Sequence, residues 1–361
     1  MEKNKSINKI KLKNIFTSLI SSNDPAVYYE NTIYSYEDLF AKSISLVTGL
    51  KDEYGIKKKD KIIVQLHNSI EFIYCYLAAA FGGFTIIPMD NSIGKKDFEY
   101  IKNEVKPKLI IQNKKQLIFL EDHSLKFEIE INDLYAIFFT SGTTGNPKGV
   151  CHSLRSLLGN ALSFNEYVGF DNSVRMMHIM PMGYMAGFLN TLLCPFLAGG
   201  SVIVAPKFNF SNIIGSGFWE LALKNNANAI WLSPTMLSLI TKMSRDDNEV
   251  NWVKKHMKYI FVGTAPLPIK VSALFKEKFG LDCLESYGMT EALIISTNKP
   301  NEIIPNSVGK ILPHVKLKSQ ELEIEKYISN KLFVKSEYMC SNYFEENHNL
   351  DLKNGWFSTG D

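Results

Sequence analysis

Residues 140–149 read Thr-Ser-Gly-Thr-Thr-Gly-Asn-Pro-Lys-Gly, and the interpretation of the whole chain begins from this stretch. The preceding stretch at 133–139 ends in apolar residues that predict a strand, while a helical pattern begins near Ser153. Glycines let a backbone turn tightly and approach a ligand, hydroxyl groups add donors, and Lys148 adds positive charge. These properties suit a polyphosphate. The residues expected to contact it are Thr140, Ser141, Gly142, Thr143, Thr144, Gly145 and Lys148.

The loop differs from the common P-loop, which ends in Gly-Lys-Ser/Thr, because Pro147-Lys148-Gly149 stands at its end. The alternative interpretation is a surface turn that is rich in Gly and Thr and binds nothing. Ten residues of this composition between a strand and a helix favour the phosphate loop.

Strand and helix patterns alternate on both sides of the loop. An apolar run at 61–66 predicts a strand, apolar residues at helical spacing over 70–80 predict a helix, and Gly82-Gly83 marks its end. Further strands are predicted at 84–87, 201–205, 229–232 and 259–262, and further helices at 216–225, 235–241 and 269–279. This alternation predicts an α/β protein with two mostly parallel β-sheets flanked by helices.

After Thr297 the pattern changes to short strands at 308–315, 331–334 and 356–357, which predict a small β-barrel-like subdomain. We therefore expect an α/β core over 1–296 and the barrel-like part over 297–361. Within the core, one subdomain is expected at about 55–175 and the other at about 20–50 together with 176–296.

Composition excludes several classes of protein. The 361 residues carry a net charge of +3 with scattered charges, so no basic footprint for nucleic acid is present. The five cysteines are dispersed without metal-ligand spacing, which indicates reduced thiols. The basic start is not followed by a signal-peptide core, and the longest apolar stretch, 72–89, contains Gly82-Gly83 and Pro88. We expect a cytoplasmic protein with no membrane span.

Three further segments follow the loop in order: Gly263-Thr-Ala-Pro-Leu267, Tyr287-Gly-Met-Thr-Glu291 and Gly355-Trp-Phe-Ser-Thr-Gly-Asp361. Together with the loop, they resemble the four motifs of the adenylate-forming (AMP-binding) superfamily, which includes acyl- and aryl-CoA synthetases, luciferases and peptide-synthetase adenylation domains. The resemblance covers nearly the whole chain. It implies the fold of that family's large N-terminal domain.

The resemblance also implies roles for residues. Tyr287 would stack on adenine, and Thr290 would donate a hydrogen bond to the α-phosphate. Glu291 would hold Mg²⁺, and Asp361 would accept hydrogen bonds from the ribose hydroxyls. The residues expected to line the rest of the nucleotide site are Gly263, Thr264, Ala265, Pro266 and Gly288. Taken alone, Tyr287 could be a core aromatic residue, a Thr-Glu pair could cap a helix, and Asp361 could be a solvated chain end.

The acyl pocket is the part of the resemblance with most departures. The family often has Pro-x-Phe-His at the pocket entrance, whereas Pro181-Met-Gly-Tyr184 stands here, so Tyr184 would be the gate. The residues expected to line this substrate pocket are Tyr184, Met185, Trp231, Ser233 and Met289, although Met and aromatic residues are as often plain core. No acidic residue occurs at 182–188 to pair with an α-ammonium group, which disfavours amino acids.

The implied activity is that of an ATP- and Mg²⁺-dependent ligase. It would join a small carboxylic acid to AMP, release pyrophosphate, and then form a thioester with CoA or with the pantetheine of an acyl carrier protein. His152 and His178 have no acidic partner in sequence, and we expect them either to be structural or to support neighbouring site residues. The competing interpretation is a non-catalytic module that binds a nucleotide or an acyl-adenylate. A kinase-type phosphotransferase is disfavoured, because no separate base or acceptor motif is present.

The chain stops at Asp361, before the small domain that carries a transition-state lysine in the family. We expect either a truncated form of low activity or a natural protein without that domain.

Overall fold

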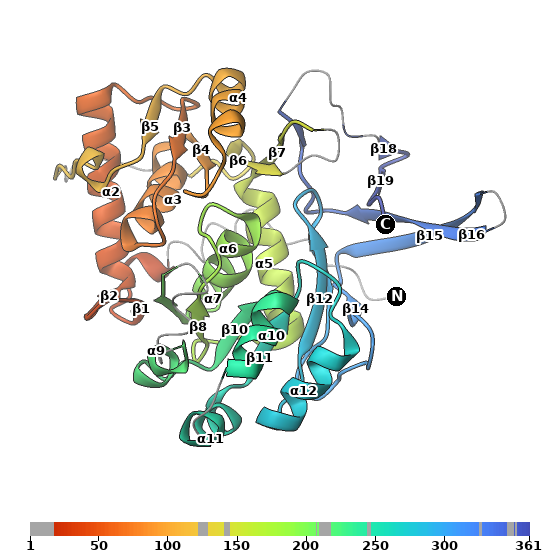
Figure 1. Cartoon of the computed structure of the whole chain (residues 1–361). Coiled ribbons are helices and arrows are strands. Elements are labelled where there is room, and N and C mark those ends of the chain that lie inside the picture. Colours follow the sequence, from red (N-terminus) through yellow and green to blue (C-terminus); the bar gives the residue numbers. More distant parts are fainter. Residues whose placement is uncertain are drawn as a thin grey trace.

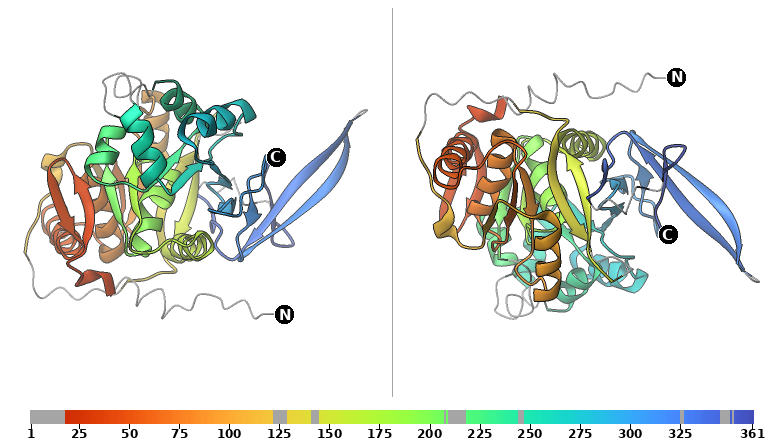
Figure 2. Two further views of the ribbon diagram at one scale, coloured as in Figure 1. Left: turned by 90° about the horizontal axis from the view of Figure 1, so that it is seen from below. Right: turned by 90° about the horizontal axis from the view of Figure 1, so that it is seen from above.

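The computed structural model describes residues 18–121, 129–140, 145–206, 208, 218–243, 247–324, 327–344, 350 and 352–361. Two large sheets lie at the centre and helices cover them, while a long hairpin projects from one side (Figures 1 and 2).

The larger sheet has nine strands in the order β14-β13-β12-β11-β10-β8-β9-β1-β2. Their bounds are β1 Pro25–Tyr29, β2 Thr32–Ser35, β8 Arg175–His178, β9 Ser201–Val204, β10 Ala229–Leu232, β11 Tyr259–Val262, β12 Leu284–Met289, β13 Leu293–Thr297 and β14 Lys310–Ile311. The pairings from β1 across to β12 are parallel, and the hairpins at both edges are antiparallel. β9, β10 and β11 are mostly apolar and buried over their whole length, as parallel strands covered on both faces require.

The second sheet has six strands in the order β17-β7-β6-β4-β3-β5. Their bounds are β3 Lys61–Val64, β4 Thr85–Pro88, β5 Leu109–Ile111, β6 Leu134–Thr140, β7 Lys148–Ser153 and β17 Asn342–Tyr343. β5, β3, β4 and β6 are parallel, whereas β7 and β17 pair antiparallel. The predicted pair of mostly parallel sheets is therefore confirmed.

The remaining strands form a four-stranded antiparallel sheet in the order β15-β16-β19-β18. Their bounds are β15 Val315–Ile324, β16 Tyr327–Ser336, β18 Leu352–Lys353 and β19 Trp356–Ser358. The β15–β16 hairpin projects from the body of the molecule (Figure 2). Two elements after Thr297 join the large sheets instead: β14 extends the nine-stranded sheet and β17 the six-stranded one. The domain division at 296/297 stays a prediction.

Helices cover the sheets. Their bounds are α2 Tyr36–Tyr54, α3 Ile70–Gly82, α4 Lys95–Val105, α5 Leu154–Val168, α6 Met185–Phe188, α7 Cys194–Leu197, α9 Phe218–Lys224, α10 Pro234–Met243, α11 Asp247–His256 and α12 Ile269–Phe279. A 3₁₀ turn, η1, spans Lys114–Gln116, and a π-helical segment, η2, spans Leu189–Leu193.

α5 lies between the two large sheets and contacts β6 and β7 of one and β13 of the other (Figure 1). Leu154, Leu157, Leu158 and Ala161 form its buried apolar face, and the Ser153 hydroxyl caps its start by accepting from the Ser156 N–H at 3.2 Å. The sequence pattern places this helix directly after the phosphate loop. The structure inserts the six-residue strand β7 first, so the loop joins two antiparallel strands.

Candidate active site

The predicted phosphate loop is the connection of the β6–β7 hairpin. Thr140 and Lys148, which we expect to be catalytic residues as well as phosphate contacts, face each other across the hairpin as its last paired residues and so lie at the base of the loop. Gly145 has φ +105°, which is strained for any residue with a Cβ. Ser141, Gly142, Thr143 and Thr144 lie outside the described residues.

A second element, the turn between β12 and β13, carries Thr290 and Glu291. Three contacts hold it. The His152 ring, on β7, lies with Nε2 2.8 Å from the Thr290 carbonyl oxygen, and the Cys340 N–H donates to the Glu291 carbonyl at 2.8 Å. The Tyr343 hydroxyl, on β17, donates to Glu291 Oε1 at 2.8 Å. The six-stranded sheet thus fixes a turn that belongs to the nine-stranded one.

Tyr343 also connects this turn to the phosphate loop. The Lys148 ammonium lies over the Tyr343 ring, 6.0 Å from its centroid. Burial, followed by the negative charge of Glu291, raises the pKa of Tyr343, so its hydroxyl stays protonated and donates to the carboxylate. A cation expected to bind phosphate and a carboxylate expected to bind metal therefore share one aromatic side chain.

The residues expected on the nucleotide side lie at the end of β11 and on β12. Gly263 is buried and its N–H donates to the Leu232 carbonyl at 3.1 Å, while Thr264 has φ +72°. A β-branched residue at this φ is an outlier, and such strain gathers at functional sites. Ala265 and Pro266 follow in an exposed loop.

Tyr287, half-buried on β12, donates its hydroxyl to Asp361 at 2.5 Å, so the residues expected at adenine and ribose lie side by side. Burial and Asp361 raise the pKa of Tyr287 to about 12.

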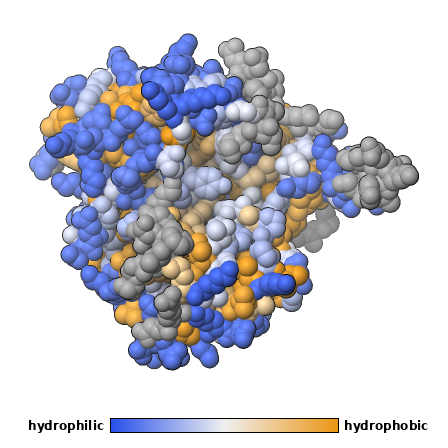
Figure 3. Space-filling model, in the orientation of Figure 1, coloured by the Kyte–Doolittle hydropathy of each residue, from blue (hydrophilic) through white to orange (hydrophobic). Residues whose placement is uncertain are grey.

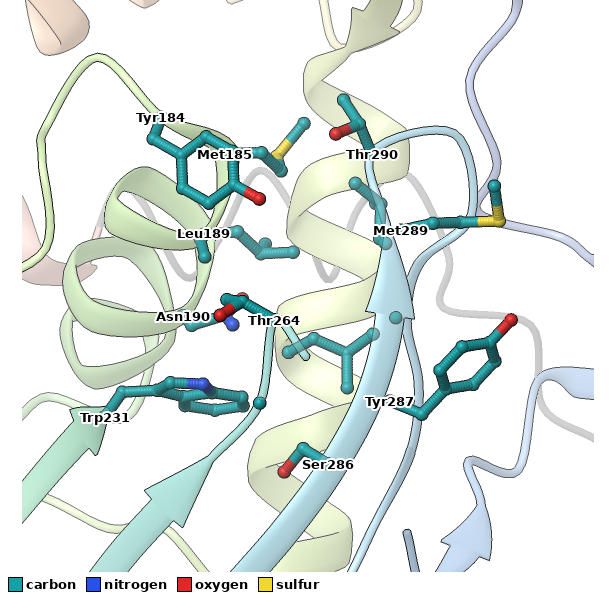
Figure 4. Close-up of a pocket in the computed structure, with 15 residues that line it drawn as sticks. Tyr184, Met185, Leu189, Asn190, Trp231, Thr264, Ser286, Tyr287, Met289 and Thr290 are labelled. Carbon is teal, nitrogen blue, oxygen red and sulfur yellow. The ribbon is translucent and has the colours of Figure 1, made fainter. Parts of the chain in front are cut away.

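These elements enclose a cleft of about 550 Å³, open solvent at its mouth included. The expected site residues that line it are Tyr184, Met185, Trp231, Gly263, Thr264, Tyr287, Gly288, Met289 and Thr290 (Figure 4). Tyr184 and Met185 face β12 across the opening (Figure 4). On the surface, apolar and weakly polar residues gather in the middle of this face, whereas hydrophilic residues dominate its outline (Figure 3).

Ser233 is absent from the lining of this cleft. Its hydroxyl accepts from the Met236 N–H at 3.2 Å and thereby caps the first turn of α10. Its predicted place in the substrate pocket stays a prediction. The helix cap is the role that the structure shows for this side chain.

The segment at 180–184, which precedes α6 and carries the expected gate residue Tyr184, is held by hydrogen bonds from α3 and from the loop that precedes α3. The Asn68 amide donates to the Met180 carbonyl at 2.8 Å and accepts from the Met182 N–H at 2.9 Å, and the Tyr76 hydroxyl donates to the Met182 carbonyl at 2.7 Å. These bonds set the position of Tyr184, whose side chain is 42% exposed at the entrance.

Sequence reasoning missed Tyr343 and Asn190. Asn190 lines the cleft from η2, and π-helical segments are frequent at functional sites. Tyr343 stands in an inconspicuous stretch, and its contacts with Lys148 and Glu291 come from chain segments far away in sequence. His152, which the sequence predicts to be structural or to support neighbouring site residues, contacts the Thr290 backbone.

Two buried histidines, His152 and His178, and the partly buried His314 predict an acid-labile fold. Burial lowers the pKa of His152, His178 and His314 to about 4. In the unfolded chain each pKa is about 6.5. The contribution of these neutral rings to the free energy of unfolding is therefore fully present above pH 6.5. It is lost as the pH falls towards 4, because in that range only the unfolded chain binds protons at these rings. Each histidine contributes up to about 1.4 kcal/mol per pH unit to this loss.

We expect the urea midpoint to be constant from pH 8 to 6.5 and to fall steeply between pH 6 and 4.5. A midpoint that does not change down to pH 4.5 would contradict the assigned neutral state of these rings.

Among the described residues, no group of three metal-ligating side chains occurs, and no helix is long and apolar enough to cross a membrane. A magnesium ion that takes most of its ligands from substrate phosphates and water needs only one or two protein carboxylates. Glu291, at the β12–β13 turn, is the carboxylate that the sequence predicts for this role.

Comparison with known proteins is consistent with this geometry. A profile of the family described as AMP-binding enzyme matches residues 20–331. The 2-succinylbenzoate–CoA ligase of Bacillus subtilis (strain 168) is 24% identical over 366 residues, which cover 93% of this chain and 71% of that protein. The mitochondrial malonate–CoA ligase ACSF3 of Mus musculus is 22% identical over 395 residues, which cover 91% of this chain and 67% of that protein.

The fold also matches a solved structure. The crystal structure of ATP-bound MatB from Rhodopseudomonas palustris superposes with a TM-score of 0.82 at 23% identity, covering 96% of this chain and 75% of that chain. The expected fold class is confirmed.

Proposed function

Because this chain belongs to the family of AMP-binding enzymes, we propose that it activates a carboxylic acid with ATP and then passes the acyl group to the thiol of CoA. Its first products would be an acyl-adenylate and pyrophosphate. The observation that supports this best is the Lys148–Tyr343–Glu291 contact, which lies beside a cleft lined by Tyr287 and Thr290.

In the first step, a carboxylate oxygen of the acid attacks the α-phosphorus of ATP. The bond from that phosphorus to the bridging oxygen breaks, and pyrophosphate leaves with the electron pair. Such a reaction depends on positioning and on charge stabilisation. Lys148 and the phosphate loop would stabilise the leaving group, Thr290 would hold the α-phosphate, and Tyr287 with Asp361 would hold the nucleoside.

Glu291 is the residue we propose for Mg²⁺, since a hard cation prefers carboxylate and phosphate oxygens, and its charge would neutralise the triphosphate. Tyr343 would orient the carboxylate. His152 would hold the neighbouring Thr290 through its backbone carbonyl, which leaves the Thr290 hydroxyl for the substrate.

CoA is the proposed thiol acceptor because the relatives named above are CoA ligases. Those relatives act on chemically different acids, 2-succinylbenzoate and malonate, so their names do not select the acid for this chain.

The test is ATP–pyrophosphate exchange with a panel of carboxylic acids, followed by a thiol-consumption assay with CoA. We expect exchange that requires both an acid and Mg²⁺, and loss of free thiol only when ATP and that acid are present. Nucleotide binding without acid-dependent exchange would contradict the proposal and favour a non-catalytic binding module.

A further inference from the structure

The inner wall of the cleft contains a hydrogen-bond donor that has no partner among the residues the structure describes. The Trp231 side chain is 2% exposed, and none of these residues offers an acceptor to its Nε1–H. Trp231 nevertheless lines the cleft, at the end of β10. A buried N–H without an acceptor is costly, so a native protein that keeps one at a binding site has a use for it.

The indole ring is held rigidly. It stacks on Phe261 with centroids 4.7 Å apart, and it contacts Phe164 at 5.7 Å. A Cβ on Gly263 would lie 3.3 Å from Nε1, so the absence of a side chain there keeps this edge of the ring open. The donor is therefore fixed in position, as selective recognition requires.

A second polar group lies on the same wall. Asn190, 8% exposed, lines the cleft from η2, and in Figure 4 the nitrogen edge of Trp231 is turned towards the side where Asn190 and Thr264 are drawn. An amide can donate as well as accept, so it can share an acceptor with Trp231.

The remaining lining is apolar or uncharged. Met185, Ala186, Leu189, Leu293 and Ile294 supply hydrocarbon, and none of the described residues that line the cleft carries a formal charge at neutral pH. A second carboxylate bound there would lose its hydration without gaining a counter-charge, which is unfavourable.

We infer that this site selects a carboxylic acid whose far end carries an uncharged hydrogen-bond acceptor, such as a ketone, ester or ether oxygen, held by Trp231 and Asn190. Plain hydrocarbon acids and dicarboxylic acids bind more weakly. This inference rests on the proposed function, because it assigns the acyl group to the same cleft.

The inference is tested with stable adenylate analogues, the 5′-O-(N-acylsulfamoyl)adenosines, in isosteric sets of three. One set carries 4-oxopentanoyl, 4-methylpentanoyl and 3-carboxypropanoyl groups. The other carries 4-acetylbenzoyl, 4-isopropylbenzoyl and 4-carboxybenzoyl groups, which place the varied atom farther from the adenylate. Within a set the members differ only in carrying a carbonyl, a branched hydrocarbon or a carboxylate, and calorimetry gives their dissociation constants.

In at least one set, we expect the keto member to bind about tenfold to a hundredfold more tightly than both others, the usual range for satisfying one buried donor. Trp231→Phe keeps the ring and removes the N–H, so it should abolish the preference for keto over hydrocarbon. It should change the affinity for the hydrocarbon analogue by less than about threefold.

Trp219→Phe is the matched control, because Trp219 is 1% exposed but lies outside the cleft on α9. It should leave the preference intact.

Equal binding within both sets, a dicarboxylate as the tightest ligand, or an unchanged preference in Trp231→Phe would overturn the inference and leave the proposed function standing. The wild-type preference tests the inference even if the Trp231 variant fails to fold. If neither ATP nor any of the six analogues binds, the proposed function itself fails.

Discussion

Replacing Glu291 with Gln is expected to lower the rate of ATP–pyrophosphate exchange by about 10²–10³, the usual cost of losing one preorganised electrostatic contact. The amide keeps the shape of the carboxylate but loses the charge that would hold Mg²⁺. It can still accept the hydrogen bond that Tyr343 donates at 2.8 Å. The thermal midpoint should change little, because the side chain is half-buried and keeps that bond.

The measurement is the exchange rate as a function of Mg²⁺ concentration, together with the Kd for Mg-ATP. The variant should need more Mg²⁺ and bind Mg-ATP more weakly. Tyr343→Phe, which leaves the charge and removes only the hydroxyl, should cost about tenfold to a hundredfold, as expected for one bond to a charged group.

Glu302→Gln is the control. Glu302 pairs with Lys299 and Lys310 at the surface, so activity should be unchanged. If Glu291→Gln leaves the magnesium dependence and the rate unchanged, the metal ligand must be another residue.

Long elements with one clear periodicity could be predicted from the sequence. α3 follows from its apolar residues and its glycine stop, and β10 and β11 follow from short apolar runs. The phosphate loop, the adenine-side loop and Tyr287 could be proposed from the sequence because the expected residue types are set by local backbone and ligand chemistry, and their roles stay predictions. Such signals lie within a few neighbouring residues.

Contacts between distant segments could not be predicted in the same way. β17 is two residues long and exists only because it pairs with β7, nearly two hundred positions earlier. The link from Lys148 through Tyr343 to Glu291 depends on that pairing, so no local pattern announces it.

The acyl pocket shows the same limit. Trp231 and Ser233 are two positions apart, and the sequence predicts one role for both. β10 places Trp231 in the cleft wall, whereas Ser233 bonds to the first turn of α10. An apolar residue at the end of a strand can be predicted as buried, but whether it faces a cleft depends on what the neighbouring elements leave empty.

Gly288→Ala is expected to disrupt the proposed nucleotide site, because the added methyl group would overlap with neighbouring atoms. A Cβ at Gly288 would lie 2.3 Å from the Leu293 carbonyl oxygen and 3.2 Å from the Ile294 Cα, both on the paired strand β13. These are backbone atoms, so no side-chain rotation can relieve the overlap, and the β12–β13 hairpin must shift. Overpacking of this kind costs about 1–3 kcal/mol of stability.

The functional loss should be larger than the loss of stability, because the shift is transmitted directly to the site. Tyr287 and Met289 flank the substituted position, and the turn that carries Thr290 and Glu291 is the end of the same hairpin. A displacement of about 1 Å in groups that position a substrate can reduce the rate about 10²-fold. We expect the folded variant to bind Mg-ATP weakly and to lose exchange activity by about that factor.

Gly94→Ala is the matched control, because Gly94 does not line the cleft and a Cβ added there would lie 3.9 Å from its nearest neighbour, Asp97 Oδ2. It should change stability by less than about 1 kcal/mol and leave ATP binding intact. Calorimetry with Mg-ATP and a urea titration on both variants separate the two effects. If Gly288→Ala binds Mg-ATP as tightly as the wild type, then the close approach of β12 and β13 is not what holds Tyr287, Thr290 and Glu291 in register with the phosphate loop, and the site must be positioned from the His152 and Tyr343 side alone.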